Sequence, residues 1–157
     1  MNKKELLSYN TDASQLIGKA EKVVFPESIE KVQSVVKTSN LDIVPRGAGT
    51  KFLGGSIPEN SIIVDMSKMN KIINIDKTKN IVYVEAGISI KELNEKLNAL
   101  GFEFPFQQIN NASTIGGMVS TNIFNFRGEY GKAKDWIGEI SFVNGRGELM
   151  KTSKSDL

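Results

Sequence analysis

A stretch rich in glycine and proline, residues 45–55 with the sequence PRGAGTKFLGG, most narrowly limits how this chain can fold, because it cannot continue as a helix. It directly follows a short apolar run at residues 43–45, which predicts a strand. Upstream, residues 23–25 predict another strand, and Ser28 can cap a helix whose apolar residues share one face. Together these segments predict a β-α-β unit that leads into the glycine-rich loop.

Short apolar runs predict further strands along the rest of the chain, at residues 62–64, 72–75 and 81–85. Near the end, residues 140–150 predict a β-hairpin around the Asn-Gly pair at residues 144–145, which favours a type I′ turn. Because strands and helices alternate, we expect an α+β fold with α/β character.

Helical spacing is clearest after Ser89, which is expected to form a capping box with Glu92. Gly101 is placed to end this helix. A further helix is expected within residues 3–19, although the apolar residues there are poorly spaced. The buried face of the helix after Ser89 is expected to hold Ile90, Leu93, Leu97 and Leu100.

The 157-residue chain contains neither cysteine nor histidine. This excludes disulfides, cysteine nucleophiles, zinc sites of the usual kind and a histidine general base, and we expect neither a metal ligand nor a catalytic residue in this chain. The formal net charge of +2 comes mostly from scattered lysines and gives no reason to expect a nucleic-acid partner. No apolar run approaches the roughly 20 residues of a transmembrane segment and no signal peptide is visible, so we expect a cytoplasmic protein.

The glycine-rich loop is a candidate phosphate-binding site. Glycine permits a positive φ and lets successive N–H groups converge on one anion, for which a diphosphate is the natural ligand. A P-loop is excluded, because Thr50 precedes Lys51 and Val44 stands where that motif needs its first glycine. A dinucleotide fingerprint is excluded too, because Phe52 occupies its third glycine position and no stable helix can begin after it. Taken alone, the loop is equally compatible with a surface turn.

Short motifs follow one another along the chain in a characteristic order. They are residues 25–28 (FPES), 45–50 (PRGAGT), 63–70 (IVDMSKMN), 84–87 (VEAG), 112–117 (ASTIGG), 130–135 (YGKAKD) and 144–147 (NGRG). In this order they resemble the FAD-linked oxidases of the vanillyl-alcohol-oxidase fold, whose cofactor module is the PCMH-type FAD-binding domain. The resemblance covers residues 22–157 and is closest to the glycolate oxidase and D-lactate dehydrogenase branch.

The resemblance implies FAD as the cofactor, held without a covalent bond because histidine and cysteine are absent. The backbone of residues 46–52 would hold the diphosphate, and residues 113–117 would pass close to the flavin. Residues 105–108 would approach the flavin ring or its ribityl chain. The cofactor-binding residues expected on this basis are Pro45, Arg46, Gly47, Ala48, Gly49, Thr50, Lys51, Phe52, Gly87, Gln107, Ser113, Thr114, Gly116, Gly117, Ser120 and Asp135.

Some of these residues also have a plain structural interpretation. Lys51 departs from the serine that is common at this position of the family, and it either pairs with a phosphate or extends into water. Asp135 serves equally well as a cap of a helix or turn. For Phe104, Phe106 and Trp136 we favour packing in the core over contact with the flavin.

The resemblance also implies a division of the chain. We expect an N-terminal extension at residues 1–21 and the FAD-binding domain at residues 22–157, with lobes at residues 22–80 and 81–157. In the family, a further loop and strand and a whole substrate domain follow. We therefore expect the second lobe to be incomplete and FAD binding to be weaker than in a complete domain.

We expect this chain to be the FAD-binding domain of a flavin-dependent oxidoreductase that, when complete, oxidises a 2-hydroxy acid such as lactate or glycolate. Alone it is expected to be inactive, with a partner chain supplying the substrate domain or a second copy covering the open edge. The alternative is a non-catalytic module that binds a flavin or nucleotide and acts only with a partner.

Overall fold

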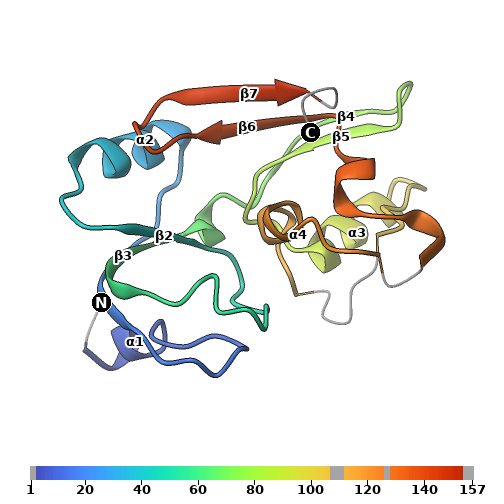
Figure 1. Cartoon of the computed structure of the whole chain (residues 1–157). Coiled ribbons are helices and arrows are strands. Elements are labelled where there is room, and N and C mark those ends of the chain that lie inside the picture. Colours follow the sequence, from blue (N-terminus) through green and yellow to red (C-terminus); the bar gives the residue numbers. More distant parts are fainter. Residues whose placement is uncertain (1–2, 107–111, 126–127, 154–157) are drawn as a thin grey trace.

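The computed structural model describes residues 3–106, 112–125 and 128–153 (Figure 1). Its first sheet is parallel, with the strand order β1-β3-β2. Helix α2 connects β1 to β2, so the expected β-α-β unit is confirmed. The elements of this part are β1 (Lys19–Val24), α2 (Ile29–Thr38), β2 (Ile43–Arg46) and β3 (Glu59–Asp65). Ile63 of the central strand β3 is fully buried.

Local sequence signals predict the residue at which α2 begins, but not the residue at which β1 begins. Ser28 caps α2 as expected, since its Oγ accepts a hydrogen bond from the N–H of Lys31 at 3.3 Å. The strand expected at residues 23–25 already begins at Lys19, because pairing with β3 supplies hydrogen bonds that the polar side chains there do not reveal.

The helix expected within residues 3–19 is confined to α1 (Lys3–Leu7), and the rest of that prediction is wrong. Leu16 and Ile17, two of the apolar residues on which it rested, are 57% and 86% exposed. A longer helix would therefore have had no apolar face to bury, and the segment forms turns instead.

An antiparallel hairpin of β4 (Ile72–Asp76) and β5 (Ile81–Val84) follows the first sheet, as expected from the two apolar runs. A short 3-10 helix, η1 (Met66–Lys68), connects β3 to it. Asn80 lies in the hairpin turn with a φ of 54°. The expected division between lobes at residue 80 falls in this turn and stays a prediction.

Helix α3 (Ile90–Asn98) begins and ends as its sequence indicates. Ser89 Oγ accepts a hydrogen bond from the Glu92 N–H at 3.1 Å. At the other end, Gly101 has a φ of 78°, and the N–H of the residue after it bonds the carbonyl of Leu97, which is a Schellman motif. Ile90, Leu93 and Leu97 are buried as expected. Leu100 is 45% exposed, so its predicted burial is wrong, because it follows the end of the helix, where the chain turns.

Helix α4 (Ile115–Thr121) was not expected from the sequence, because its glycines lower its helix propensity. Thr114 begins it by accepting a hydrogen bond from the N–H of Gly117 at 3.2 Å. Two 3-10 turns follow, η2 (Gly128–Tyr130) and η3 (Ala133–Trp136). Among the helices that the structure describes, none is long and apolar enough to cross a membrane.

The predicted C-terminal hairpin consists of β6 (Glu139–Val143) and β7 (Leu149–Ser153). Its turn is not the expected type I′ turn. The N–H of Gly147 bonds the carbonyl of Asn144 at 2.9 Å, and the positive φ, 75°, belongs to Gly147. The longer turn lies against α2 (Figure 1), where Gln33 Nε2 donates to the Gly147 carbonyl at 2.9 Å.

The core of the second half lies around α3 and α4. Phe106 is fully buried, and Phe104 is partly buried against the same cluster at 6.0 Å between ring centroids, so their predicted packing in the core is confirmed. Trp136 remains 40% exposed and makes a T-shaped contact with Phe104 at the margin of this core. The expectation that Trp136 is a core residue is therefore only partly met.

Candidate functional site

The glycine-rich loop begins where β2 ends, and its main-chain donors are available to a ligand. Gly49 is left-handed with a φ of 64°, a conformation that side chains rarely permit. Within the described part of the chain, the N–H groups of residues 47–50 donate to no other protein group. Consecutive N–H groups beside a left-handed residue form a concave donor site of the kind that binds anions.

A second segment, residues 113–117, lies against this loop. Ser113 and Thr114 are only 3% and 7% exposed. The hydroxyl oxygens of Thr50 and Ser113 are hydrogen-bonded at 2.7 Å, across 63 residues of sequence. A Cβ added at Gly47 would lie 2.2 Å from Oγ1 of Thr114, so the two segments approach as closely as a glycine allows. The structure therefore brings together these two groups of predicted site residues.

The second segment is held in place by the residues that follow β5. The N–H of Gly116 bonds the carbonyl of Ala86 at 2.8 Å, and the N–H of Ile115 bonds the carbonyl of Ile88 at 2.9 Å. A Cβ added at Gly116 would lie 2.9 Å from the Cβ of Ala86. The start of α4, and with it Ser113 and Thr114, is thus fixed by backbone contacts that need a small residue.

Gly87 lies in the same supporting stretch and packs on η1. Its N–H bonds the carbonyl of Met69 at 2.8 Å. A Cβ at Gly87 would overlap the carbonyl oxygen of Met66, only 1.9 Å away. Because η1 follows β3 directly, this contact ties the second segment to the first sheet, and it gives Gly87 a role in packing.

The two cations of the loop, Arg46 and Lys51, are in different surroundings. The guanidinium of Arg46 donates to the carbonyls of Tyr9 and Thr11, at 3.3 and 2.9 Å. Lys51 is half-buried, and this burial lowers the pKa of its amine. The next residue, Phe52, is 76% exposed. Arg46 is thus bonded to main-chain carbonyls of the N-terminal segment, and Lys51 is the cation we weigh for contact with a ligand of the loop.

One residue that sequence reasoning missed, Tyr9, lies before β1 and supports the glycine-rich loop through Arg46, whose Nη1 donates to the Tyr9 carbonyl at 3.3 Å. Tyr9 donates its hydroxyl to Oδ2 of Asp65 at 2.8 Å. Burial and then this hydrogen bond raise the pKa of Tyr9 to about 12. Asp65 belongs to the motif at residues 63–70, from which its place near the site could have been predicted. Tyr9 carries no comparable signal, because its partner lies 56 residues away.

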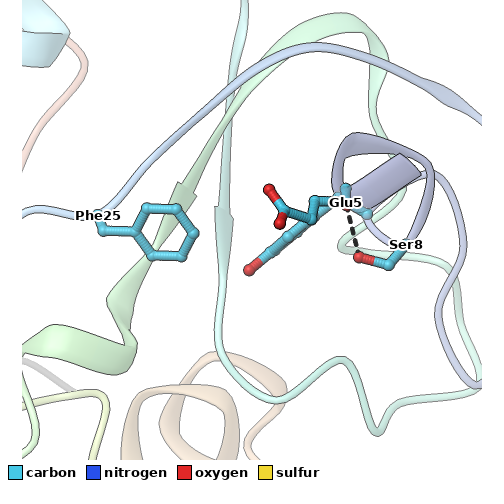
Figure 2. Close-up of a pocket in the computed structure, with 4 residues that line it drawn as sticks. Glu5, Ser8 and Phe25 are labelled. Carbon is cyan, nitrogen blue, oxygen red and sulfur yellow. Dashed lines mark hydrogen bonds between the residues drawn. The ribbon is translucent and has the colours of Figure 1, made fainter. Parts of the chain in front are cut away.

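A shallow hollow of about 470 Å³ lies beside Tyr9 and is lined also by Glu5, Ser8 and Phe25. Figure 2 shows the Phe25 ring opposite the side chains of Glu5, from α1, and Ser8, which follows α1. The hollow adjoins none of the small residues that form the junction of the two segments, so it is not the candidate site.

The remaining predicted residues make contacts that are structural. Pro45 pairs with β3 in the parallel sheet. The hydroxyl of Ser120 donates to the carbonyl of Gly116 at 2.8 Å. Asp135 Oδ2 accepts a hydrogen bond from the N–H of Lys132 at 2.8 Å, which is the capping role weighed for it. Gln107 lies outside the described residues.

Metal-binding chemistry has no support here: the described residues contain no group of three or more His, Cys, Asp or Glu side chains that could hold a metal ion. The site is built from main-chain donors, hydroxyls and one nearby lysine. This donor set suits an anion such as a diphosphate.

Comparison with known proteins agrees with this chemistry. Residues 20–153 match the protein family described as FAD binding domain. The chain is 30% identical over 150 residues to a D-lactate dehydrogenase of Anaerostipes hadrus, a match that covers 91% of this chain and 32% of that protein. It is 36% identical over 158 residues to a D-2-hydroxyglutarate dehydrogenase of Escherichia coli strain K12, covering 93% of this chain and 15% of the relative.

A solved structure is similar as well. The fold superimposes on an alkyldihydroxyacetonephosphate synthase with a TM-score of 0.74 and 25% sequence identity, over 83% of this chain and 28% of that one. The chain spans about a third or less of the length of these relatives.

Proposed function

The chain belongs to the FAD binding domain family, and on that basis we propose that its glycine-rich loop and residues 113–117 together hold the diphosphate of FAD. Membership confirms the resemblance to FAD-linked oxidases, FAD as the ligand, and the α+β fold of a PCMH-type FAD-binding domain. The lobes at residues 22–80 and 81–157 are proposed as the two sides of this site.

One observation carries the proposal: the free N–H groups of residues 47–50 lie beside the junction of Gly47 with Thr114. A diphosphate needs several donors within a small space, and small residues allow it to approach the backbone closely. The chain offers both at one place, together with the hydroxyls of Thr50 and Ser113. The residues present therefore fit the cofactor that the family implies.

For the whole protein, we propose the oxidation of a 2-hydroxy acid, the class to which lactate and 2-hydroxyglutarate belong. The support is that similar proteins are named D-lactate and D-2-hydroxyglutarate dehydrogenases. Bound FAD supplies the acceptor for the two electrons of such an oxidation. The share of this chain is to bind and orient the cofactor. It has no histidine, and we assign the base that takes the hydroxyl proton to a part of the protein beyond these residues.

Titration of the purified chain with FAD tests the proposal. We expect saturable binding, a yellow protein, and complete release of FAD on denaturation, since the chain has no histidine or cysteine for a tether. Riboflavin, which lacks the diphosphate, should bind much more weakly. A chain that stays colourless and ignores added FAD would refute the proposal. Oxidation of D-lactate with a dye acceptor by this chain alone would contradict the assignment of catalysis to other residues.

Lys51 is expected to strengthen FAD binding by pairing with the diphosphate. Replacing it in Lys51→Ser should raise the Kd for FAD by about 3- to 10-fold at low salt, because a half-buried charge pair contributes on the order of 1 kcal/mol. The difference should shrink as salt is raised, because ions screen the attraction. The matched control is Lys77→Ser in the exposed β4–β5 turn, which should leave the Kd unchanged. A Kd for Lys51→Ser equal to that of the wild type at low salt would show that Lys51 does not pair with the diphosphate.

A further inference from the structure

The side chain of Arg46 is held by the N-terminal segment in a way that fixes its direction. Its Nη1 donates to the carbonyl of Tyr9 at 3.3 Å and its Nη2 to the carbonyl of Thr11 at 2.9 Å. The guanidinium also lies 5.3 Å from the centre of the Tyr9 ring. The planar fork of an arginine suits two carbonyls at once, which a lysine ammonium cannot match. We call residues 9–13 the N-terminal strap.

The strap contacts the glycine-rich loop at further points. The N–H of Ala13 bonds the carbonyl of Gly49 at 3.0 Å. A Cβ at Gly49 would lie 2.6 Å from Nη2 of Arg46, so the guanidinium packs directly on the left-handed residue of the loop. Beyond the loop, Ser56 Oγ donates to Oδ2 of Asp12 at 2.7 Å. The strap thus touches the beginning, middle and far side of the loop.

The strap is itself attached to the first sheet. The Tyr9 hydroxyl donates to Asp65 at 2.8 Å, and Asp65 is the residue that pairs with Arg46 in the β2–β3 ladder. Asp65 is 6% exposed. The side chain of Asn10 accepts a hydrogen bond from the N–H of Ala20 in β1 at 2.8 Å. Arg46 is therefore clamped between a sheet-bound strap and the loop that it begins.

We propose that Arg46 is a positioning residue for the diphosphate of FAD: its guanidinium holds the glycine-rich loop on the N-terminal strap and does not contact the phosphates. This inference rests on the proposed function of the loop. A loop held in its binding conformation loses less conformational freedom when FAD binds, and the affinity rises accordingly. Residues 9–13 then belong to the cofactor-binding machinery, although nothing in their sequence indicates a nucleotide site.

The test is the substitution Arg46→Lys, which keeps the positive charge and loses the two-carbonyl fork. We expect the Kd for FAD to rise about tenfold, because the shorter, point-like ammonium cannot reproduce the planar fork that bonds both carbonyls. The dependence of the Kd on salt should stay that of the wild type, since the lost contacts are to carbonyls. Tyr9→Phe, which removes only the bond to Asp65, should raise the Kd about threefold. Arg146→Lys in the exposed β6–β7 turn is the matched control and should have no effect.

A measurement without FAD keeps the inference separate from the proposed function. Trypsin cleaves after Lys51, and the apo form of Arg46→Lys should be cut there about tenfold faster than the apo wild type, since a freed loop fits a protease more readily. Binding of FAD by Arg46→Lys with wild-type affinity and an unchanged cleavage rate would overturn the positioning role. So would a weaker salt dependence, which would place the arginine charge on the phosphates. If the wild type does not bind FAD, the proposed function is refuted. Faster cleavage of apo Arg46→Lys would in that case still show that Arg46 holds the loop on the N-terminal strap.

Discussion

Replacing Gly47 with alanine is expected to weaken FAD binding about 100-fold or more, because the added methyl group has no room between the two segments of the site. The added Cβ would lie 2.2 Å from Oγ1 of Thr114 and 3.2 Å from its Cγ2. Thr114 cannot simply turn aside, because it is 7% exposed and its Oγ1 caps α4 through the N–H of Gly117. The loop and the second segment must then separate, and the donors on the two sides no longer meet one diphosphate. Isothermal titration of Gly47→Ala with FAD measures the loss.

Gly55→Ala is the matched control for this prediction, because nothing lies within 4 Å of a Cβ at that position in the same loop region. It should bind FAD as the wild type does. The double variant of Gly47→Ala with Thr114→Ala removes the clashing hydroxyl and should recover part of the lost affinity, at the cost of about 1 kcal/mol of stability from the missing cap. Near-normal FAD binding by Gly47→Ala alone would mean that the junction of the two segments is not the diphosphate site.

Local signals predicted the elements that begin or end at a residue of special chemistry. Ser28 and Ser89 cap α2 and α3, and Gly101 ends α3, because each of these effects depends only on neighbours in sequence. The same reasoning placed the positive φ of the β6–β7 turn at residues 144–145, whereas the structure has it at Gly147. An Asn-Gly pair favours a tight turn, but the contact of Gly147 with Gln33 of α2 comes from another part of the chain. Long-range contacts of this kind are not encoded in local spacing.

The candidate site shows the same limit. The loop could be predicted from its glycines, whereas its partner Ser113, 63 residues away, was identified only through the family resemblance. Helix α4 was missed because its glycines, which allow Gly116 to approach Ala86, are poor helix formers. Arg46 was expected in the site for its backbone, and the structure adds that its side chain bonds carbonyls. Charge alone does not reveal which partner an arginine has.

Replacing Gly87 with alanine is expected to destabilise the fold itself by about 3 kcal/mol. A Cβ there would lie 1.9 Å from the carbonyl oxygen of Met66 and 2.8 Å from that of Met69. Both obstacles are backbone atoms, so no rotation of a side chain can relieve the overlap. The N–H of Gly87 also bonds the Met69 carbonyl at 2.8 Å, and this bond is lost if Gly87 and the segment after η1 move apart. For a chain of this size the melting temperature should fall by roughly 6–12 °C.

Urea denaturation followed by circular dichroism measures this loss, and Gly138→Ala is its control, because a Cβ at Gly138 would meet no atom within 4 Å. The control should stay within about 0.5 kcal/mol of the wild type. Gly47→Ala and Gly87→Ala should have different main effects. Gly47→Ala should lose FAD binding while the apo chain stays folded, whereas Gly87→Ala should lose fold stability first. FAD binds only the folded chain and should raise the melting temperature of Gly87→Ala progressively, with the logarithm of its concentration above the Kd. An unchanged denaturation midpoint for Gly87→Ala would show that η1 can move away from Gly87, and that the two halves of the site are joined through the Thr50–Ser113 contact instead.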